Sequence, residues 1–253
     1  MSYPEKKSSV FQSPSFGGVG EAIILAGGLG TRLRSAVPDL PKCMAPVNGK
    51  PFIVYVIDHL QQQGVEKFIF SLGYQSEKLI DFLDDFYSNL KSKIPNLKFL
   101  YSIEEEPLGT GGAIQLACSK ATTENVIVTN GDTLFKVNLD KLFGLHQQQK
   151  ADCTLSLKPM QNFERYGVVE MNEQTAISSF KEKQFYEQGL INGGLYALNV
   201  QALLQKNLPE KFSFEKDYLE KYFTEGKMFG SVQDEYFIDI GIPEDYNRAQ
   251  IEL

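Results

Sequence analysis

The sequence has few of the residues that build disulfide, metal or nucleic-acid sites. Its three cysteines, Cys43, Cys118 and Cys153, are widely spaced and form no Cys-x-x-Cys or Cys/His pattern. This predicts reduced thiols, as in a cytosolic protein. The two histidines, His59 and His146, have no metal-spaced partner, so we expect packing or surface roles for them. The net charge of −7 disfavours general binding to nucleic acid, because a phosphate backbone would be repelled.

Long hydrophobic runs are also missing. No apolar run approaches the ~20 residues that cross a bilayer, so we expect no membrane partner. The first 20 residues lack the apolar segment of a secretory signal and are rich in Ser, Pro and Gly. We therefore predict a flexible N-terminal extension over residues 1–20 and a cytoplasmic protein. The content of 42% hydrophobic and 23% charged residues is typical of a globular domain.

What the sequence does contain is a glycine-rich turn directly after an apolar run. Gly27, Gly28 and Gly30 follow the run within a few residues. Such glycines let the backbone approach a ligand closely and point several amides the same way, which makes a nest for phosphate. Arg32 and Lys42 add positive charges that suit a triphosphate. The pattern predicts a nucleotide site.

Several known kinds of phosphate-binding loop can be compared with this turn. A Walker A loop ends in Gly-Lys-Ser/Thr, whereas this turn ends in Gly30-Thr31-Arg32. A dinucleotide fingerprint needs a third glycine where Leu33 stands. A turn that binds nothing needs neither Arg32 nor the later Lys42. The whole string, GGLGTRL followed by PK, instead resembles the signature of the sugar-phosphate nucleotidylyltransferases.

Strand and helix patterns alternate after residue 20. Strands are predicted at 21–26, 67–72, 97–102 and 125–130, with helices at 51–63, 76–87 and 111–119 between them. This order predicts a mainly parallel, doubly wound sheet that binds ligands at the carboxyl ends of its strands. From about residue 151 most segments are strand-like, and helices are predicted at 212–223 and 243–253. We expect one domain over 21–253, with halves at about 21–150 and 151–253.

Two aspartates stand where a cation could be held. Asp132 follows the strand predicted at 125–130, and Asp239 ends a strand predicted at 234–240. Mg²⁺ is commonly bound by one or two carboxylates together with phosphate oxygens, so this pair predicts a magnesium site. For each aspartate alone, a turn-forming or helix-capping role is the alternative.

Two further clusters suit a base and a sugar phosphate. A second glycine turn, with Gly109 and Thr110, follows three acids that include Glu105. Its backbone can line a base, and a carboxylate there suits the adjacent N–H donors of guanine; a plain helix-entry turn is the alternative. The run from Phe180 to Lys183 is by itself typical of a solvated face. Beside Tyr166-Gly167 and Asn192-Gly193-Gly194 it fits a sugar-phosphate pocket.

From residue 21 to the C-terminus the chain resembles the sugar-1-phosphate nucleotidylyltransferase family. Within it, the heptose 1-phosphate guanylyltransferases are most similar, through EEEPLGTGGA, RYGVV, LINGGLY and FIDIGIPEDY. The resemblance implies a Rossmann-like, three-layer α/β/α sandwich with a mainly parallel mixed sheet. It also implies Mg²⁺-dependent transfer of GMP from GTP to D-glycero-α-D-manno-heptose 1-phosphate, with release of pyrophosphate.

The resemblance further implies a role for each motif residue. It assigns catalysis to Arg32, Lys42, Asp132 and Asp239, and it makes the two aspartates the metal ligands. Nucleotide binding falls to Leu25, Ala26, Gly27, Gly28, Gly30, Thr31, Arg32, Glu105, Gly109, Thr110 and Gly131. Sugar-phosphate binding falls to Gly167, Glu182, Lys183, Asn192 and Gly193. The chain departs from the family in two places: Cys43 replaces the proline that usually follows Lys42, and the N-terminal extension is atypical.

Other functions remain open at this point. The same front half serves mannose-1-phosphate guanylyltransferases and enzymes that act on other sugar 1-phosphates. A sugar-nucleotide sensor without catalysis would be expected to lose Arg32, Lys42 or one aspartate, and all are kept. A glycosyltransferase favours Asp-x-Asp, whereas Asn130-Gly131-Asp132 supplies one acid. The sequence leaves open whether the chain forms a homo-oligomer.

Overall fold

The fold is given by a computed structural model that describes residues 20–28, 33, 37, 40–73, 76–91, 94 and 96–253. The predicted site residues Gly30, Thr31 and Arg32 lie outside the described residues, as do residues 1–19 of the predicted extension. In the described part of the chain, no helix combines the length and the apolar character needed to span a membrane.

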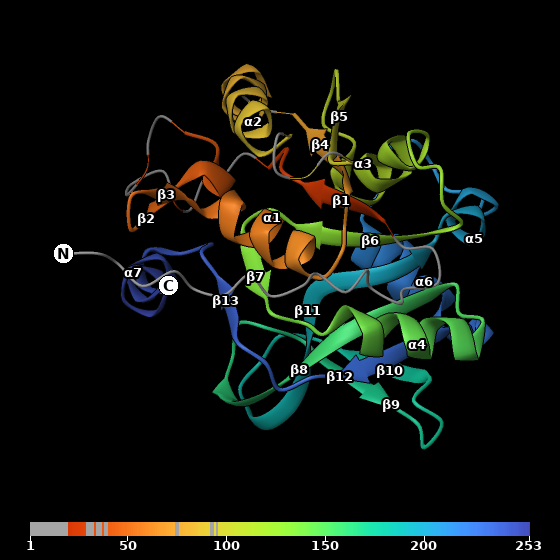
Figure 1. The fold of residues 1–253 in the computed structure, drawn as a ribbon. Coiled ribbons are helices and arrows are strands. Elements are labelled where there is room, and N and C mark those ends of the chain that lie inside the picture. Colours follow the sequence, from red (N-terminus) through yellow and green to blue (C-terminus); the bar gives the residue numbers. More distant parts are fainter. Residues whose placement is uncertain are drawn as a thin grey trace, which may run out of the picture.

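A mixed sheet runs through the centre of the molecule (Figure 1). In the described chain it has nine strands, with the order β10-β9-β11-β6-β1-β4-β5; β8 also pairs with β11, and β12 pairs with β8. The parallel part consists of β6 (Asn125–Asn130), β1 (Glu21–Leu25), β4 (Lys67–Leu72) and β5 (Lys98–Ile103). The rest consists of β8 (Cys153–Phe163), β9 (Val168–Met171), β10 (Ile177–Lys181), β11 (Tyr186–Asn199) and β12 (Met228–Val232). β11 runs antiparallel to β6, so the second half of the chain extends the sheet of the first.

Helices cover both faces of this sheet and complete three layers. One face carries α1 (Phe52–Gln62), α2 (Ser76–Lys91), α4 (Leu139–Gln149) and α7 (Pro243–Glu252). The other carries α3 (Gly109–Cys118), α5 (Val200–Leu204), α6 (Glu220–Tyr222) and a π-helix (Phe214–Leu219). After Glu21, strand β1 is apolar because helices cover both of its faces: Ile24 packs against the first helical layer and Ile23 against the second. The arrangement confirms the predicted three-layer fold class.

The carboxyl ends of β1 and β6 meet at one edge of the sheet. Leu25 lies opposite Asn130 in the parallel ladder, and Gly131 N donates to Leu25 O at 2.8 Å. A small antiparallel ladder continues from this edge, formed by β7 (Thr133–Phe135) and β13 (Phe237–Asp239). A second small ladder, β2 (Pro46–Val47) with β3 (Lys50–Pro51), follows the single turn Lys42–Met44. The glycine turn and the two aspartates are therefore brought to the same edge.

The predicted segments agree with this fold except at residues 212–223, which belong to the second helical layer. The strands predicted at 67–72 and 125–130 have those bounds, and the helix predicted from residue 76 continues to residue 91. The helix predicted over 212–223 is present from residue 214 on, but it is not a single regular α-helix. The chain there forms the π-helix, then α6, and ends in the short turn Phe223–Glu225. Phe214 N donates to Thr110 Oγ1 at 2.9 Å, which ties the start of this segment to α3.

Candidate functional site

A lysine lies between two aspartates at the carboxyl edge of the sheet. Lys42 Nζ is 2.5 Å from Asp132 Oδ2 and 3.5 Å from Asp239 Oδ1. The three side chains are 14%, 28% and 23% exposed, so the charges are largely shielded from water. One ammonium faces two carboxylates, which leaves this cluster with an excess of negative charge. We call these three residues the acid–lysine cluster.

Backbone contacts hold the two aspartates in place. Asp239 is paired with Thr133 in the β7–β13 ladder, directly after Asp132, and Ile240 N donates to Asp132 O at 3.1 Å. Gly241 N donates to Asp239 Oδ1 at 2.8 Å. A Cβ on Gly241 would lie 2.9 Å from Lys42 Nζ and 2.8 Å from Asp239 Oδ1, so a side chain there would displace the charged groups of the cluster. Backbone contacts and this close approach together fix the arrangement of the cluster.

The donor set of the cluster suits a hard divalent cation that also takes oxygens from a ligand. Two carboxylates with phosphate oxygens and water match the preference of Mg²⁺. Within the described residues there is no group of three or more His, Cys, Asp or Glu side chains arranged to hold a metal by themselves. At this edge the two aspartates would supply two of the ligands of a cation, and phosphate oxygens or water would supply the others.

A first cavity, of about 460 Å³, opens at the ends of β1, β4 and β5 beside the start of α3. It is lined by Leu25, Gly27, Gly28, Ser71, Gly73, Glu104, Glu105, Glu106, Pro107, Gly109, Thr110 and Ala113. A Cβ on Gly27 would lie 2.9 Å from Gly73 N and 3.0 Å from Glu104 Oε1. Gly27 therefore packs backbone to backbone against the end of β4, where a side chain would not fit.

The acids of the first cavity differ in their surroundings. Glu104 is half-buried, and its Oε2 accepts a hydrogen bond from Leu108 N at 2.9 Å. Burial raises the pKa of Glu104, and the bond from Leu108 N opposes that rise. Glu105 and Glu106 are exposed. Only Glu104 is fixed in direction by the protein backbone among these three.

The turn into α3 joins the first cavity to a second one. Gly109 has a φ of 74°, and a Cβ there would lie 2.6 Å from Phe212 O. Thr110 Oγ1 donates to Glu215 Oε2 at 2.8 Å. Because Glu215 lines the second cavity, this bond spans the wall between the two.

The second cavity, of about 500 Å³, lies between β9, β10, β11 and the π-helix. Its polar lining residues are Asn130, Tyr166, Lys181, Glu182, Lys183, Asn192, Ser213, Glu215, Lys216 and Glu220. Asn192 is held in place, because its Nδ2 donates to Tyr196 Oη at 2.8 Å and its Oδ1 accepts from Gly194 N at 3.1 Å. Lysines and carboxylates converge here around an open space, which suits a ligand with both hydroxyl and phosphate groups.

Comparison with known proteins gives the family. The nucleotidyl transferase family matches residues 21–253. The chain belongs to this family. This nucleotidyl transferase is 51% identical to a D-glycero-alpha-D-manno-heptose 1-phosphate guanylyltransferase from Aneurinibacillus thermoaerophilus, over 92% of this chain and 98% of the relative. It is 44% identical to the protein of that name from Campylobacter jejuni, over 89% and 96% of the two chains.

A solved structure agrees with these relatives. HddC from Yersinia pseudotuberculosis, crystallised in complex with GMP-PN, matches the fold with a TM-score of 0.78 and 38% identity. The match covers 92% of this chain and 98% of HddC. The family and the fold together make the chain an enzyme of the nucleotidyl transferase type.

The residues predicted for the nucleotide are distributed over several places. Leu25, Gly27, Gly28, Glu105, Gly109 and Thr110 line the first cavity of the nucleotidyl transferase. Ala26 and Gly131 are not among its lining residues: Ala26 N donates to Ser71 O at 2.8 Å, and Gly131 N bonds to Leu25 O. These two fix the ends of neighbouring strands.

Most residues predicted for the sugar phosphate line the second cavity. Gly167, Glu182, Lys183 and Asn192 are among them, and Gly193 is not. A Cβ on Gly193 would lie 2.4 Å from Phe135 Cδ1, so this glycine makes room for an aromatic ring, and Gly194 faces the cavity in its place.

Several lining residues were missed from the sequence. Ser71 and Gly73 stand at the end of β4, and a polar residue after a strand on the ligand-binding edge was the available signal. Glu104 belongs to the same acidic run as Glu105, and the run alone does not show which acid turns inward. Glu215 and Lys216 come from a segment that carries no recognisable motif, so only the fold brings them near.

Cys43, which replaces the expected proline, is buried beside the acid–lysine cluster. Burial and the nearby charge of Asp132 raise the pKa of its thiol to about 12. The thiol is therefore neutral near pH 7 and is a packing group, not a nucleophile.

Proposed function

We propose that the chain transfers GMP from GTP to D-glycero-α-D-manno-heptose 1-phosphate and releases pyrophosphate. The observation that carries the proposal is the acid–lysine cluster, built at the strand edge that borders the two cavities. The choice of substrates is supported by the names of the relatives from Aneurinibacillus and Campylobacter. The GMP-PN in the HddC complex supports a guanine nucleotide.

The first cavity would take the nucleotide and the second the sugar phosphate. A phosphate oxygen of the sugar attacks the α-phosphorus of GTP, one P–O bond forms, and the bond to pyrophosphate breaks. The nucleophile is already ionised at neutral pH, so no general base is needed. Positioning and charge neutralisation carry such a reaction.

The chain supplies the neutralising groups at three points. Lys42 would contact the phosphates of the reacting centre, and Arg32 would compensate the charge that develops on pyrophosphate. Asp132 and Asp239 would hold Mg²⁺, which when bound draws charge from the phosphate oxygens. Gly27, with the turn that follows it, would hold the triphosphate.

We assign recognition of the base to Glu104 in place of the predicted Glu105. The guanine edge presents adjacent N–H donors, which a carboxylate of fixed direction can accept together. Glu104 is held by Leu108 N and approaches Gly27, whereas Glu105 is exposed. For the sugar phosphate we propose Glu182 and Asn192 as hydroxyl partners and Lys183 as a phosphate partner, with the backbone at Gly167 closing the site.

We further propose that residues 21–253 act as one catalytic domain, with a nucleotide-binding half at about 21–150 and a sugar-phosphate-binding half at about 151–253. Both halves contribute strands to one sheet, which supports a single domain made of these two halves. Three buried free cysteines, Cys43, Cys118 and Cys153, support a reducing cytoplasmic location.

A pyrophosphate-release matrix tests the proposal. Purified protein is given each of four nucleoside triphosphates with each of several sugar 1-phosphates in the presence of Mg²⁺. We expect turnover with GTP and the heptose phosphate, and much less with mannose 1-phosphate. A preference for UTP or CTP would contradict the guanine assignment, and faster turnover of mannose 1-phosphate would contradict the sugar.

A further inference from the structure

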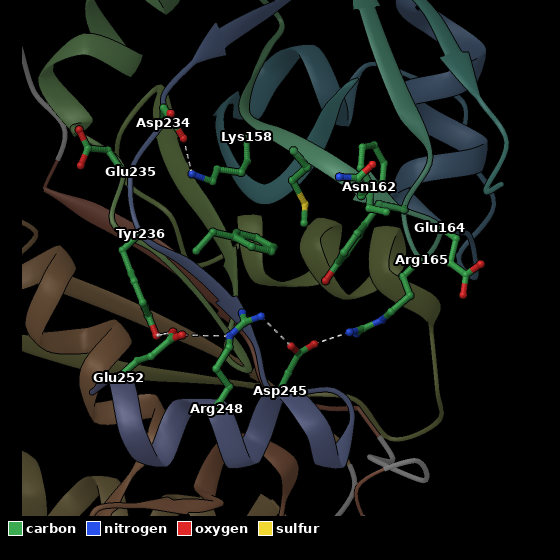
Figure 2. A pocket seen from close by; sticks show the side chains of 14 residues that line it. Lys158, Asn162, Glu164, Arg165, Asp234, Glu235, Tyr236, Asp245, Arg248 and Glu252 are labelled. Atoms are coloured by element: carbon green, nitrogen blue, oxygen red, sulfur yellow. Dashed lines mark hydrogen bonds and ion pairs between the residues drawn. The ribbon is translucent and has the colours of Figure 1, made fainter. Parts of the chain in front are cut away.

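A third cavity, of about 720 Å³, lies beside α7 and shares Tyr166 with the second cavity. Figure 2 shows that its rim carries a connected set of charged side chains. No residue of α7 lines the first or the second cavity. The polar side of this helix therefore needs an explanation other than contact with a ligand in those two cavities.

Asp245, in the first turn of α7, is the centre of the set. Its carboxylate is 12% exposed, and one oxygen accepts a hydrogen bond from Arg165 Nη1. The other oxygen forms an ion pair with Arg248 Nη1, at 3.1 Å. Arg248 Nε is 3.4 Å from Glu252 Oε1, and Tyr236 Oη donates to Glu252 Oε2 at 2.9 Å. Figure 2 shows these five side chains as one continuous line.

The two ends of this line belong to segments that enter the candidate site. Arg165 directly precedes Tyr166 and Gly167, which line the second cavity. Tyr236 directly precedes β13, which carries Asp239. The two segments also touch each other, since the rings of Tyr166 and Phe237 meet edge to face with centroids 6.0 Å apart. Helix α7 thus ties the sugar-side loop to the strand of a candidate metal ligand.

Charge also links Arg165 to the site. Burial lowers the pKa of its guanidinium, but the hydrogen bond to Asp245 and the negative charges of Asp245 and Asp239 raise it overall. Arg165 and Asp239 therefore attract each other, although no hydrogen bond or ion pair joins them in the described part of the chain.

The set is poorly suited to binding an anion of its own. Each cation on the rim already has an acidic partner, including Lys158, whose Nζ is 2.5 Å from Asp234 Oδ1. Partly buried ion pairs also add little net stability, because desolvation offsets their attraction. What such a pair does supply is direction, since the N–H groups of the planar Arg165 guanidinium point along fixed lines.

We propose that Asp245 is a positioning residue, which through Arg165 holds the Tyr166–Gly167 segment and the Asp239 strand together for reaction of the sugar phosphate. This rests on the proposed assignment of the second cavity to the sugar phosphate. Asp245 itself touches neither substrate. Loosening it should mainly affect the sugar side of the reaction, because the first cavity shares no residue with this set.

The test uses Asp245→Asn and Arg165→Met, with Arg165→Lys and Arg248→Ala as controls. We expect the first two to raise the KM for the sugar phosphate about tenfold, as small misplacements of binding groups do, and to leave the KM for GTP within about twofold. Arg165→Lys keeps the charge but not the planar fork, so it should recover part of the loss. Arg248 is 46% exposed and binds the same carboxylate from outside, so Arg248→Ala should change either KM by less than about twofold.

Equal rises in both KM values, or no selective rise in either Asp245→Asn or Arg165→Met, would overturn the proposal. Thermal unfolding of each variant accompanies the kinetics, and Arg165→Met serves if Asp245→Asn fails to fold. The sugar phosphate used is whichever one the wild type turns over fastest, so a wrong choice of sugar does not affect this test. Glu182→Gln separates the cavity assignment from the positioning role. An unchanged KM for the sugar phosphate in this variant refutes the assignment of the second cavity. A raised KM in Glu182→Gln, together with normal KM values in the Asp245 and Arg165 variants, refutes the positioning role alone.

Discussion

Replacement of Lys42 by methionine removes the cation that, among the described residues, forms an ion pair with both Asp132 and Asp239. Loss of one partner from a fully buried ion pair costs about 3–5 kcal/mol, and exposed pairs are worth about 0–1 kcal/mol. The three side chains here are 14–28% exposed, between those limits, so we expect a loss of about 2 kcal/mol. For a domain of this size that corresponds to a fall in Tm of about 4–8 °C.

Divalent cations should restore part of this loss. With the lysine absent, the two carboxylates of Lys42→Met keep their place in the β7–β13 ladder and have no counter-charge. A cation that binds the folded state alone raises Tm by mass action. Thermal unfolding with and without millimolar Mg²⁺ should therefore show a larger Mg²⁺-dependent rise in the variant than in the wild type. Turnover should fall about 10²–10³-fold, as for loss of a charge-stabilising donor.

Lys50→Met is the matched control. Lys50 Nζ lies 2.6 Å from Asp58 Oδ2, a distance like that of Lys42 from Asp132, but these side chains are 37% and 40% exposed. We expect a loss of less than about 1 kcal/mol, with no effect of Mg²⁺. The reasoning from the acid–lysine cluster would be refuted if Tm fell equally in the two variants. It would also be refuted if the Tm of Lys42→Met did not change with Mg²⁺.

Three further predictions concern the base, the core and pH. Glu104→Gln should raise the KM for GTP about 10–100-fold, because a charge-assisted hydrogen bond is worth about 1.5–3 kcal/mol. Glu105→Gln should have little effect. If steady-state kinetics show the reverse order, base recognition belongs to Glu105. Gly193→Ala should lower the free energy of unfolding by about 1–3 kcal/mol, because its Cβ would lie 2.4 Å from Phe135 Cδ1; an unchanged urea midpoint would show that the ring can move. Burial lowers the pKa of His146 from 6.5 to about 4, so the unfolded chain takes up a proton first and stability should fall as pH drops from 6.5 to 4. Urea midpoints at several pH values should show a smaller fall in His146→Gln, and parallel curves would argue against this histidine as the cause.

The first strand and its neighbour could be predicted well because parallel strands obey a simple rule. An apolar run followed by glycines indicates a buried strand with a ligand at its carboxyl end. The same rule put Asp132 at this edge, and the bond from Gly131 N to Leu25 O confirms that placement. The histidines also agree with expectation: His146 is buried and bonds to Thr154 Oγ1 and Asn125 Oδ1, each at 3.0 Å.

Contacts between distant segments were not readable from local pattern. Asp239 reaches Lys42 through the β7–β13 ladder; the strand predicted at 234–240 contains β13, but β7 has only three residues and gave no periodic signal. The choice between Glu104 and Glu105, or between Gly193 and Gly194, depends on which way one peptide turns. Over a few residues the π-helix has the same apolar spacing as an ordinary helix, so its type could not be predicted. Its bond to the turn at Thr110 joins segments about a hundred residues apart, which no local pattern shows.

The central claim is that GTP binds with its guanine in the first cavity and its α-phosphorus at the acid–lysine cluster. A crystal structure with a non-hydrolysable GTP analogue and Mg²⁺ tests it most directly. We expect the base edge against Glu104, Lys42 on the phosphates and a cation that contacts both Asp132 and Asp239. A nucleotide bound in another place, or aspartates remote from its α-phosphorus, would contradict the account.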